Sequence, residues 1–148
     1  MTGKPVEVLL VEDNPGDVRL TREAFRDSRV PTNMHVATDG VEAMDFVKRR
    51  GKFSVAPRPD IILLDLNLPR KDGREVLEEL KKDDDLKSIP VVILTTSRSQ
   101  EDIERTYRSH ANCYITKPVD LDQFLRVMRT IEDFWLTLVK LPACDSHV

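Results

Sequence analysis

The sequence lacks long apolar runs. Among its 148 residues, no apolar stretch approaches the ~20 residues that a membrane-crossing helix needs. The N-terminus also lacks a basic segment followed by an apolar one, which is the pattern of a secretory signal. We therefore expect no membrane association and a cytoplasmic location.

Cysteine and net charge are also scarce. The two cysteines, Cys113 and Cys144, lie far apart and show no metal-binding or redox spacing. The net charge is only −3 and no basic stripe appears, so we expect no nucleic-acid partner. There are no repeats or low-complexity segments. With 40% apolar and 33% charged residues, the composition is typical of one soluble domain with a single core.

The sequence does contain a regular alternation of apolar runs and amphipathic segments. Strands are predicted at residues 6–11, 34–37, 61–64, 91–95 and 112–116. Helices are predicted at residues 16–26, 41–50, 73–82, 100–109 and 120–138. Each helix is long enough to cross back over a sheet. This pattern predicts an α/β fold, a doubly wound five-stranded parallel sheet with helices on both faces.

Two of the predicted helices have contrasting apolar faces. The segment 73–82 places Val76, Leu77 and Leu80 on one face, which we expect to be buried. The segment 100–109 is mostly polar, with Ile103 and Tyr107 as its main apolar contacts. We therefore expect the second helix to be loosely held.

Functional side chains follow the predicted strands. The run 61–64 is continuously apolar, as in strands buried on both faces, and ends at Asp65. Glu12 and Asp13 follow the first strand, Thr95 ends the fourth, and Lys117 follows the fifth. Open parallel sheets bind ligands at the carboxyl ends of their strands, so we expect these side chains to converge.

The three carboxylates predict a metal site. Glu12, Asp13 and Asp65 would repel one another unless a cation joined them or their pKa values rose. Mg²⁺ suits this set because it prefers oxygen ligands and keeps several waters, and the backbone carbonyl of Asn67 is placed to add a ligand. The simpler alternative is a set of separate, solvated loop carboxylates.

The same pattern is compatible with phosphoryl chemistry. A cation would leave Asp65 free to attack a phosphoryl group and form an aspartyl phosphate. Lys117 would supply positive charge and Thr95 a hydroxyl to the transferred group. Taken singly, Lys117 is better explained as an ordinary surface lysine and Thr95 as an ordinary β-branched strand residue, and it is their joint occurrence at consecutive strand ends that favours the functional interpretation.

Four segments in order resemble the receiver domain of two-component response regulators. They are residues 9–14 (LLVEDN), 61–69 (IILLDLNLP), 92–96 (VILTT) and 114–118 (YITKP). The spacing also agrees, with 52 residues from Asp13 to Asp65 and 52 from Asp65 to Lys117. The resemblance covers residues 6–138 and implies a flavodoxin-like fold of the receiver type.

The resemblance implies a role for each residue. Asp65 would accept a phosphoryl group from a histidine kinase, and Glu12 and Asp13 would hold Mg²⁺ with it. Lys117 would pair with the phosphoryl oxygens, Thr95 would turn inward, and Tyr114 would follow as an aromatic switch. Tyr114 is also compatible with a half-buried aromatic on an edge strand.

Finer features resemble the single-domain regulators of cyanobacterial phytochromes. These features are residues 57–60 (PRPD), 67–77 (NLPRKDGREVL) and 133–135 (DFW). They imply a phytochrome-type histidine kinase as the phosphodonor. We expect residues 1–148 to form a single receiver domain, with a core over 6–138, a polar tail over 139–148 and no effector domain.

The predicted last helix carries more apolar residues than one core stripe needs. Val127, Phe134 and Leu136 fall off the stripe that includes Trp135. The resemblance implies a homodimer through this side, and Val127, Phe134, Trp135 and Leu136 are the candidate interface. Scattered surface apolars are the alternative.

Two other function classes remain as alternatives. A hydrolase of the haloacid dehalogenase type also uses Mg²⁺ and an aspartyl phosphate, but needs its nucleophile in an Asp-x-Asp motif on the first strand. Here the candidate is Asp65-Leu66-Asn67 on the third. A phosphate-independent interaction scaffold with a receiver fold would have no chemical need for the acidic, hydroxyl and lysine set. We therefore expect a phospho-accepting signalling protein and not a metabolic enzyme.

Overall fold

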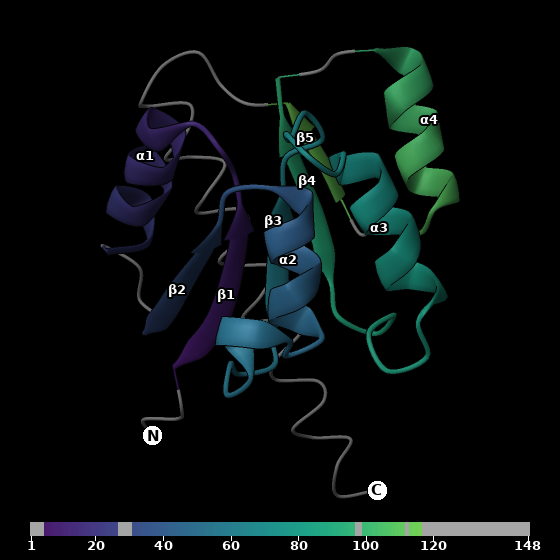
Figure 1. Cartoon of the computed structure of the whole chain (residues 1–148). Helices are drawn as coiled ribbons and strands as arrows, with labels where there is room; N and C mark the ends of the chain where they lie inside the picture. The colour runs from purple at the N-terminus through teal and green to yellow at the C-terminus, as the bar shows by residue number, and fades with distance from the viewer. Residues whose placement is uncertain (1–4, 27–30, 97–98, 112, 117–148) are drawn as a thin grey trace, which may run out of the picture.

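Strands and helices alternate along the chain (Figure 1). The computed structural model describes residues 5–26, 31–96, 99–111 and 113–116. The strands are β1 (Val6–Val11), β2 (Thr32–Ala37), β3 (Ile61–Leu64), β4 (Val91–Thr95) and β5 (Cys113–Thr116). The helices are α1 (Pro15–Arg26), α2 (Gly40–Val47), α3 (Gly73–Lys82) and α4 (Gln100–Arg108), with a short 3-10 helix, η1 (Gly51–Phe53). The helix predicted at 120–138 lies outside the described residues.

The five strands form one parallel sheet in the order β2-β1-β3-β4-β5. This order places β3 at the centre, between β1 and β4. Leu64, the last residue of β3, pairs with Val11 of β1 and Ile93 of β4. The predicted five-stranded parallel sheet is therefore confirmed.

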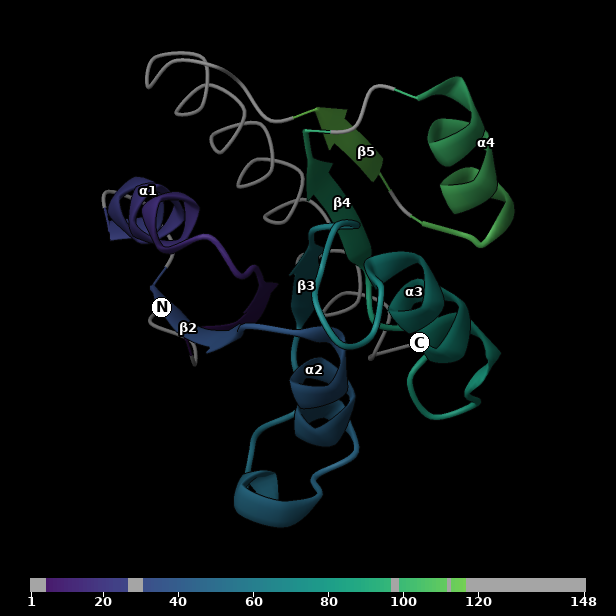
Figure 2. The ribbon, with the colours of Figure 1, turned by 45° about the horizontal axis from the view of Figure 1, so that its top comes forward.

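Two apolar layers cover the two faces of the sheet. On β3, Ile62 and Leu64 pack in one layer with residues of α2 and α3, whereas Ile61 and Leu63 pack in the other, against α1. Figure 2 shows α1 on one side of the sheet and α2 and α3 on the other. All four β3 side chains are buried, as the uninterrupted apolar run predicts. The doubly wound arrangement is thus confirmed.

Local signals account for most helix bounds. The α3 helix spans the predicted residues and buries Val76, Leu77 and Leu80. Its N-cap, Asp72, accepts a hydrogen bond from the Arg74 amide at 3.0 Å. The α2 helix ends at Val47, before the predicted residue 50, because Arg49 adopts a left-handed φ of 56° that no helix continues.

The prediction for α4 was wrong at Tyr107. That side chain is 50% exposed, and the buried side chain of the helix is Thr106, at 1%. The Thr106 hydroxyl donates to the Ile103 carbonyl oxygen at 3.0 Å, so it is satisfied inside the helix and can be buried. In the part of the chain described here, no helix has the length and apolarity to cross a bilayer.

Candidate functional site

Three carboxylates meet at the carboxyl edge of the sheet. Glu12 and Asp13 follow β1, and Asp65 follows β3. One carboxylate oxygen from each lies within 4.8 Å of the other two. Glu12 is 3% exposed and Asp65 8%, whereas Asp13 is exposed. The cluster therefore has a buried base and an open side.

The sheet itself positions this acidic cluster. The Asp65 amide donates to the Val11 carbonyl at 3.1 Å, which extends the β1–β3 pairing past the end of β3. The Glu12 amide donates to the Ala37 carbonyl at 2.9 Å, on the other side of β1. Because neighbouring strands hold both backbones, the carboxylates project from fixed points.

Backbone amides next to the strands orient two of the carboxylates. The Asn14 amide donates to Glu12 Oε2 at 3.1 Å, and the Asn67 amide donates to Asp65 Oδ1 at 3.1 Å. The second contact brings the Asn67 peptide beside Asp65. The predicted ligand role of the Asn67 carbonyl stays a prediction.

The loop that follows Asp65 packs tightly against α3. A Cβ added at Gly73 would collide with the Asp65 carbonyl oxygen and the Leu66 backbone. The Gly73 amide donates to the Leu66 carbonyl at 2.9 Å. Within this loop Arg70, at a φ of 65°, donates to Asp39 Oδ2 at 3.2 Å. These contacts fix the backbone that follows Asp65.

Thr95 lies at the same edge of the sheet as the acidic cluster. It ends β4, it is fully buried, and it pairs with Thr116 of β5. Tyr114 pairs with Ile93, but its side chain lies outside the described residues. Lys117 and the interface candidates Val127, Phe134, Trp135 and Leu136 also lie outside the described residues.

The donor set fits a hard divalent cation. Carboxylate oxygens from three residues converge within bonding reach of one ion, and one of them faces the open side of the cluster. Mg²⁺ accepts such a set because it binds few protein oxygens and completes its octahedron with water.

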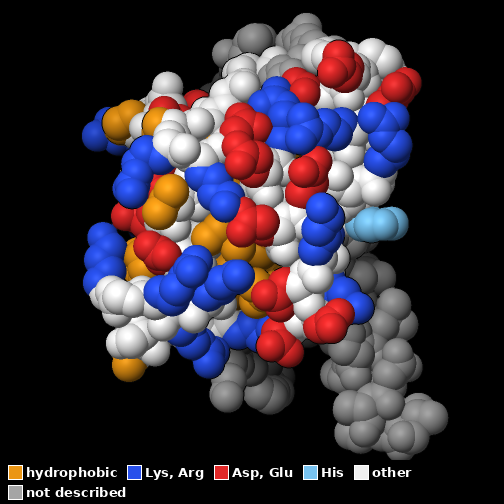
Figure 3. Space-filling view, turned by 45° about the vertical axis from the view of Figure 1, so that its right-hand side comes forward, with side chains coloured by type: hydrophobic (Ala, Val, Ile, Leu, Met, Phe, Trp, Pro, Cys, Tyr) orange, Lys and Arg blue, Asp and Glu red, His pale blue; other side chains and the backbone are white. Residues whose placement is uncertain are grey.

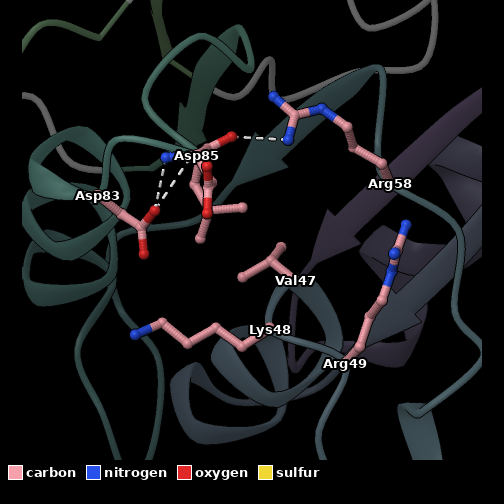
Figure 4. A pocket seen from close by; sticks show the side chains of 7 residues that line it. Val47, Lys48, Arg49, Arg58, Asp83 and Asp85 are labelled. Atoms are coloured by element: carbon pink, nitrogen blue, oxygen red, sulfur yellow. Dashed lines mark hydrogen bonds between the residues drawn. The ribbon is translucent and has the colours of Figure 1, made fainter.

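A cavity of about 480 Å³ lies at the opposite edge of the sheet, where the strands begin (Figure 4). It is lined by Val47, Lys48, Arg49, Arg58, Asp83, Asp85 and Leu86. Arg58 donates to the Asp85 carbonyl oxygen at 2.6 Å and to the Ser88 hydroxyl at 3.1 Å. The charged groups that line the cavity are of both signs, and Arg58 is already engaged in holding the turn before β4. The acidic cluster is therefore the better candidate site.

A sequence model of the response regulator receiver domain matches residues 8–129. The chain belongs to this receiver domain family. The family serves signalling and not metabolic turnover, and the chain is a response regulator of the two-component type.

Several known receivers are similar over nearly the whole chain. The response regulator Rcp1 of Synechocystis sp. is 48% identical over 139 residues, which are 94% of this chain and 95% of Rcp1. The crystal structure of the phosphorylated cyanobacterial phytochrome response regulator RcpA matches with a TM-score of 0.87 and 50% identity, over 91% of this chain and 96% of that one. The Mn²⁺-bound form of Rcp1 matches with a TM-score of 0.85 and 47% identity, over 89% of this chain and 95% of that one.

Sequence reasoning missed one polar feature next to the receiver site. Arg74 of α3 donates to Asp102 of α4 through two nitrogen atoms. The partners are 28 residues apart on different helices. No local pattern pairs them, so only the three-dimensional structure could reveal the contact.

Proposed function

We propose that this receiver accepts a phosphoryl group on Asp65 from a histidine kinase, with Mg²⁺ held by Glu12, Asp13, Asp65 and the Asn67 carbonyl. The observation that carries the proposal is the convergence of three carboxylates within 4.8 Å beside a central, buried strand. Two similar proteins support it: RcpA, which was crystallised in its phosphorylated form, and Rcp1, which was crystallised with Mn²⁺ bound.

The chemistry of the transfer rests on Asp65. One carboxylate oxygen attacks the phosphorus of a phosphohistidine, the P–N bond breaks, and its electron pair stays on the imidazole nitrogen. Lys117 and Thr95 are proposed to bind the phosphoryl oxygens. Bound Mg²⁺ neutralises charge on the carboxylates and on the transferred group. The protein catalyses its own phosphorylation and dephosphorylation and turns over no metabolite.

The proposed phosphodonor is a phytochrome-type histidine kinase. RcpA is named as a phytochrome response regulator, and it is 50% identical to this chain. The proposal includes a cytoplasmic location and an output through changed protein contacts, with a homodimer formed by the segment 120–138.

Intact-mass analysis after incubation with acetyl phosphate tests the proposal. We expect one added phosphoryl group that requires Mg²⁺ and is absent in Asp65→Asn. The matched control is Asp45→Asn, because Asp45 lies on α2 outside the acidic cluster and should leave labelling unchanged. If wild type takes no label and does not bind beryllofluoride, the protein is a phosphate-independent scaffold and the proposal is wrong.

A further inference from the structure

Two reciprocal arginine–carboxylate pairs join α3 and α4. Arg74 of α3 donates from Nε and Nη2 to the two oxygens of Asp102 on α4, at 2.7 and 2.5 Å. Arg105 of α4 donates from Nε to Glu78 Oε2 of α3 at 3.0 Å, and its Nη2 lies 2.9 Å from the same oxygen. Figure 3 shows basic and acidic side chains interspersed over the face that carries these helices. Paired charges thus hold the two helices together.

Of these two pairs, only Arg74–Asp102 also contacts the loop that follows Asp65. Arg74 is the second residue of α3, and its Nη1 contacts the Leu66 carbonyl oxygen at 3.4 Å. The same nitrogen donates to both oxygens of the N-cap, Asp72, at 3.0 and 3.2 Å. Leu66 directly follows Asp65, so one guanidinium contacts the loop after the phospho-acceptor and the first turn of α4. No such contact with the loop is found for the Arg105–Glu78 pair in the described part of the chain.

Burial separates the two pairs as well. The side chains of Arg74 and Asp102 are 18% and 14% exposed, against 43% and 35% for Arg105 and Glu78. Hydrogen bonds to Asp102 and then to Asp72 raise the pKa of the Arg74 guanidinium above its ordinary value, although burial acts in the opposite direction. Arg74 therefore stays charged, and water screens its contact less than it screens the outer pair.

The α4 helix has little apolar anchoring of its own. Thr106 is the buried residue of the helix, and its first turn carries Glu101 and Asp102. The position of that turn consequently depends on polar contacts, of which Arg74–Asp102 is the more buried link to α3.

We infer that Arg74 is a positioning residue for Asp65, and that Asp102 holds it there, so that the first turn of α4 and the phospho-acceptor loop are coupled. The predicted effect on the reactivity of Asp65 rests on the proposed function. The predicted effect on the position of the loop after Asp65 does not. A partner that displaces the first turn of α4 would change the reactivity of Asp65 without touching the acidic cluster.

Amide hydrogen exchange in the metal-free, unphosphorylated protein tests the structural step. The amides to follow are those of Gly73 and Leu68, which both donate to the Leu66 carbonyl. We expect Asp102→Asn to speed their exchange about threefold to tenfold. The control is Glu78→Gln, which weakens the other tie between the same helices and should change these amides less than twofold. Equal effects in the two variants, or none in either, would overturn the inference.

The rate of phosphorylation by acetyl phosphate with saturating Mg²⁺ tests the chemical step. We expect Asp102→Asn to change the rate about threefold to tenfold, Asp102→Glu to restore most of it, and Glu78→Gln to leave it near wild type. Arg74→Lys keeps the charge without the forked geometry, so it should behave like Asp102→Asn, and it replaces that variant if Asp102→Asn does not fold. A phosphorylation rate that is unchanged in both Asp102→Asn and Arg74→Lys would overturn the coupling. If wild-type protein takes no label, the proposed function fails, and the exchange measurement still decides whether Arg74 positions the loop.

Discussion

At Gly73 the chain has no room for a side chain. A Cβ there would meet the Asp65 carbonyl oxygen and the Leu66 backbone, and backbone atoms cannot turn aside as a flexible side chain can. We expect Gly73→Ala to lower the free energy of unfolding by about 1–3 kcal/mol, as overpacking does elsewhere. Urea denaturation measures this change.

Gly16→Ala is the matched control for that substitution. Gly16 also lies in the first turn of a helix, α1, but its nearest neighbour is the Asn14 side-chain oxygen at 3.2 Å, which can move. We expect the free energy of unfolding to stay within about 1 kcal/mol of wild type. If the two substitutions lower the free energy of unfolding equally, the close approach of α3 to Asp65 is not what requires glycine at position 73.

Glu7 joins β1 to the edge strand β2. Its carboxylate contacts His35 Nε2 at 2.7 Å and accepts a hydrogen bond from Asn33 at 3.1 Å. The contact with His35 holds the Glu7 pKa below its ordinary value of 4.5, against the opposing effect of burial. A lowered pKa means that the folded state favours the ionised form. This stabilisation is therefore present above about pH 4.5 and is lost as the pH falls through the folded-state pKa.

We expect Glu7→Gln to remove this part of the acid sensitivity. At pH 6 the free energy of unfolding of the variant should be about 1 kcal/mol lower than that of wild type, because a hydrogen bond to a partly exposed charged group is lost. The difference should shrink as the pH falls below 4.5. Urea denaturation across this range measures the effect, with the exposed Glu101→Gln as control. A constant difference at every pH would contradict the ionic explanation.

Individual residues show why the site could be predicted only in part. Glu12, Asp13 and Asp65 each follow an apolar run, so the strand pattern alone indicated that they share one edge, and the structure brings them within 4.8 Å. The fit of Gly73 against Asp65 has no such pattern, because it depends on the approach of a helix to a loop.

Among the helices, α2 is tied through its N-cap to the loop that follows Asp65. Asp39 is 8% exposed, accepts the Glu42 amide at 2.7 Å, and accepts a hydrogen bond from Arg70 at 3.2 Å. We expect Asp39→Ala to cost about 1–2 kcal/mol of unfolding free energy, since the cap and the ion pair are both lost. Asp39→Asn keeps a capping oxygen and should cost less. Urea denaturation compares the two, and equal costs would show that the cap contributes little.

Prediction of whole elements succeeded where apolar periodicity was strong. The bounds of α3 agree because Val76, Leu77 and Leu80 form a regular stripe after a clear N-cap. In α4 the apolar residues are too few to define a face, and the side chain that is buried is a threonine. Its ties to α3 are ionic and non-local, which hydrophobic periodicity does not report.

At the scale of the whole molecule, the homodimer stays a prediction. We expect light scattering at micromolar concentration to give twice the mass of one chain, and Phe134→Ala to shift it toward the monomer, because an apolar contact across a symmetric interface is lost twice. The control is Tyr107→Ala, which removes an exposed aromatic from α4 and should leave the mass unchanged. A monomeric wild type would show that the interface does not form.

The pairing of β1 with β3 also bears on the order of folding during synthesis. β1 and β2 pair over a short separation, from Val6 to Thr32, whereas β1 meets β3 only across the distance from Val8 to Ile61. The longer loop closes more slowly, so a growing chain can complete the first βαβ unit before β3 arrives. Asp65 joins Glu12 and Asp13 only at that second step. Binding of a cation to the proposed site during refolding would therefore report the pairing of β1 with β3, and excess cation would favour the paired state by mass action.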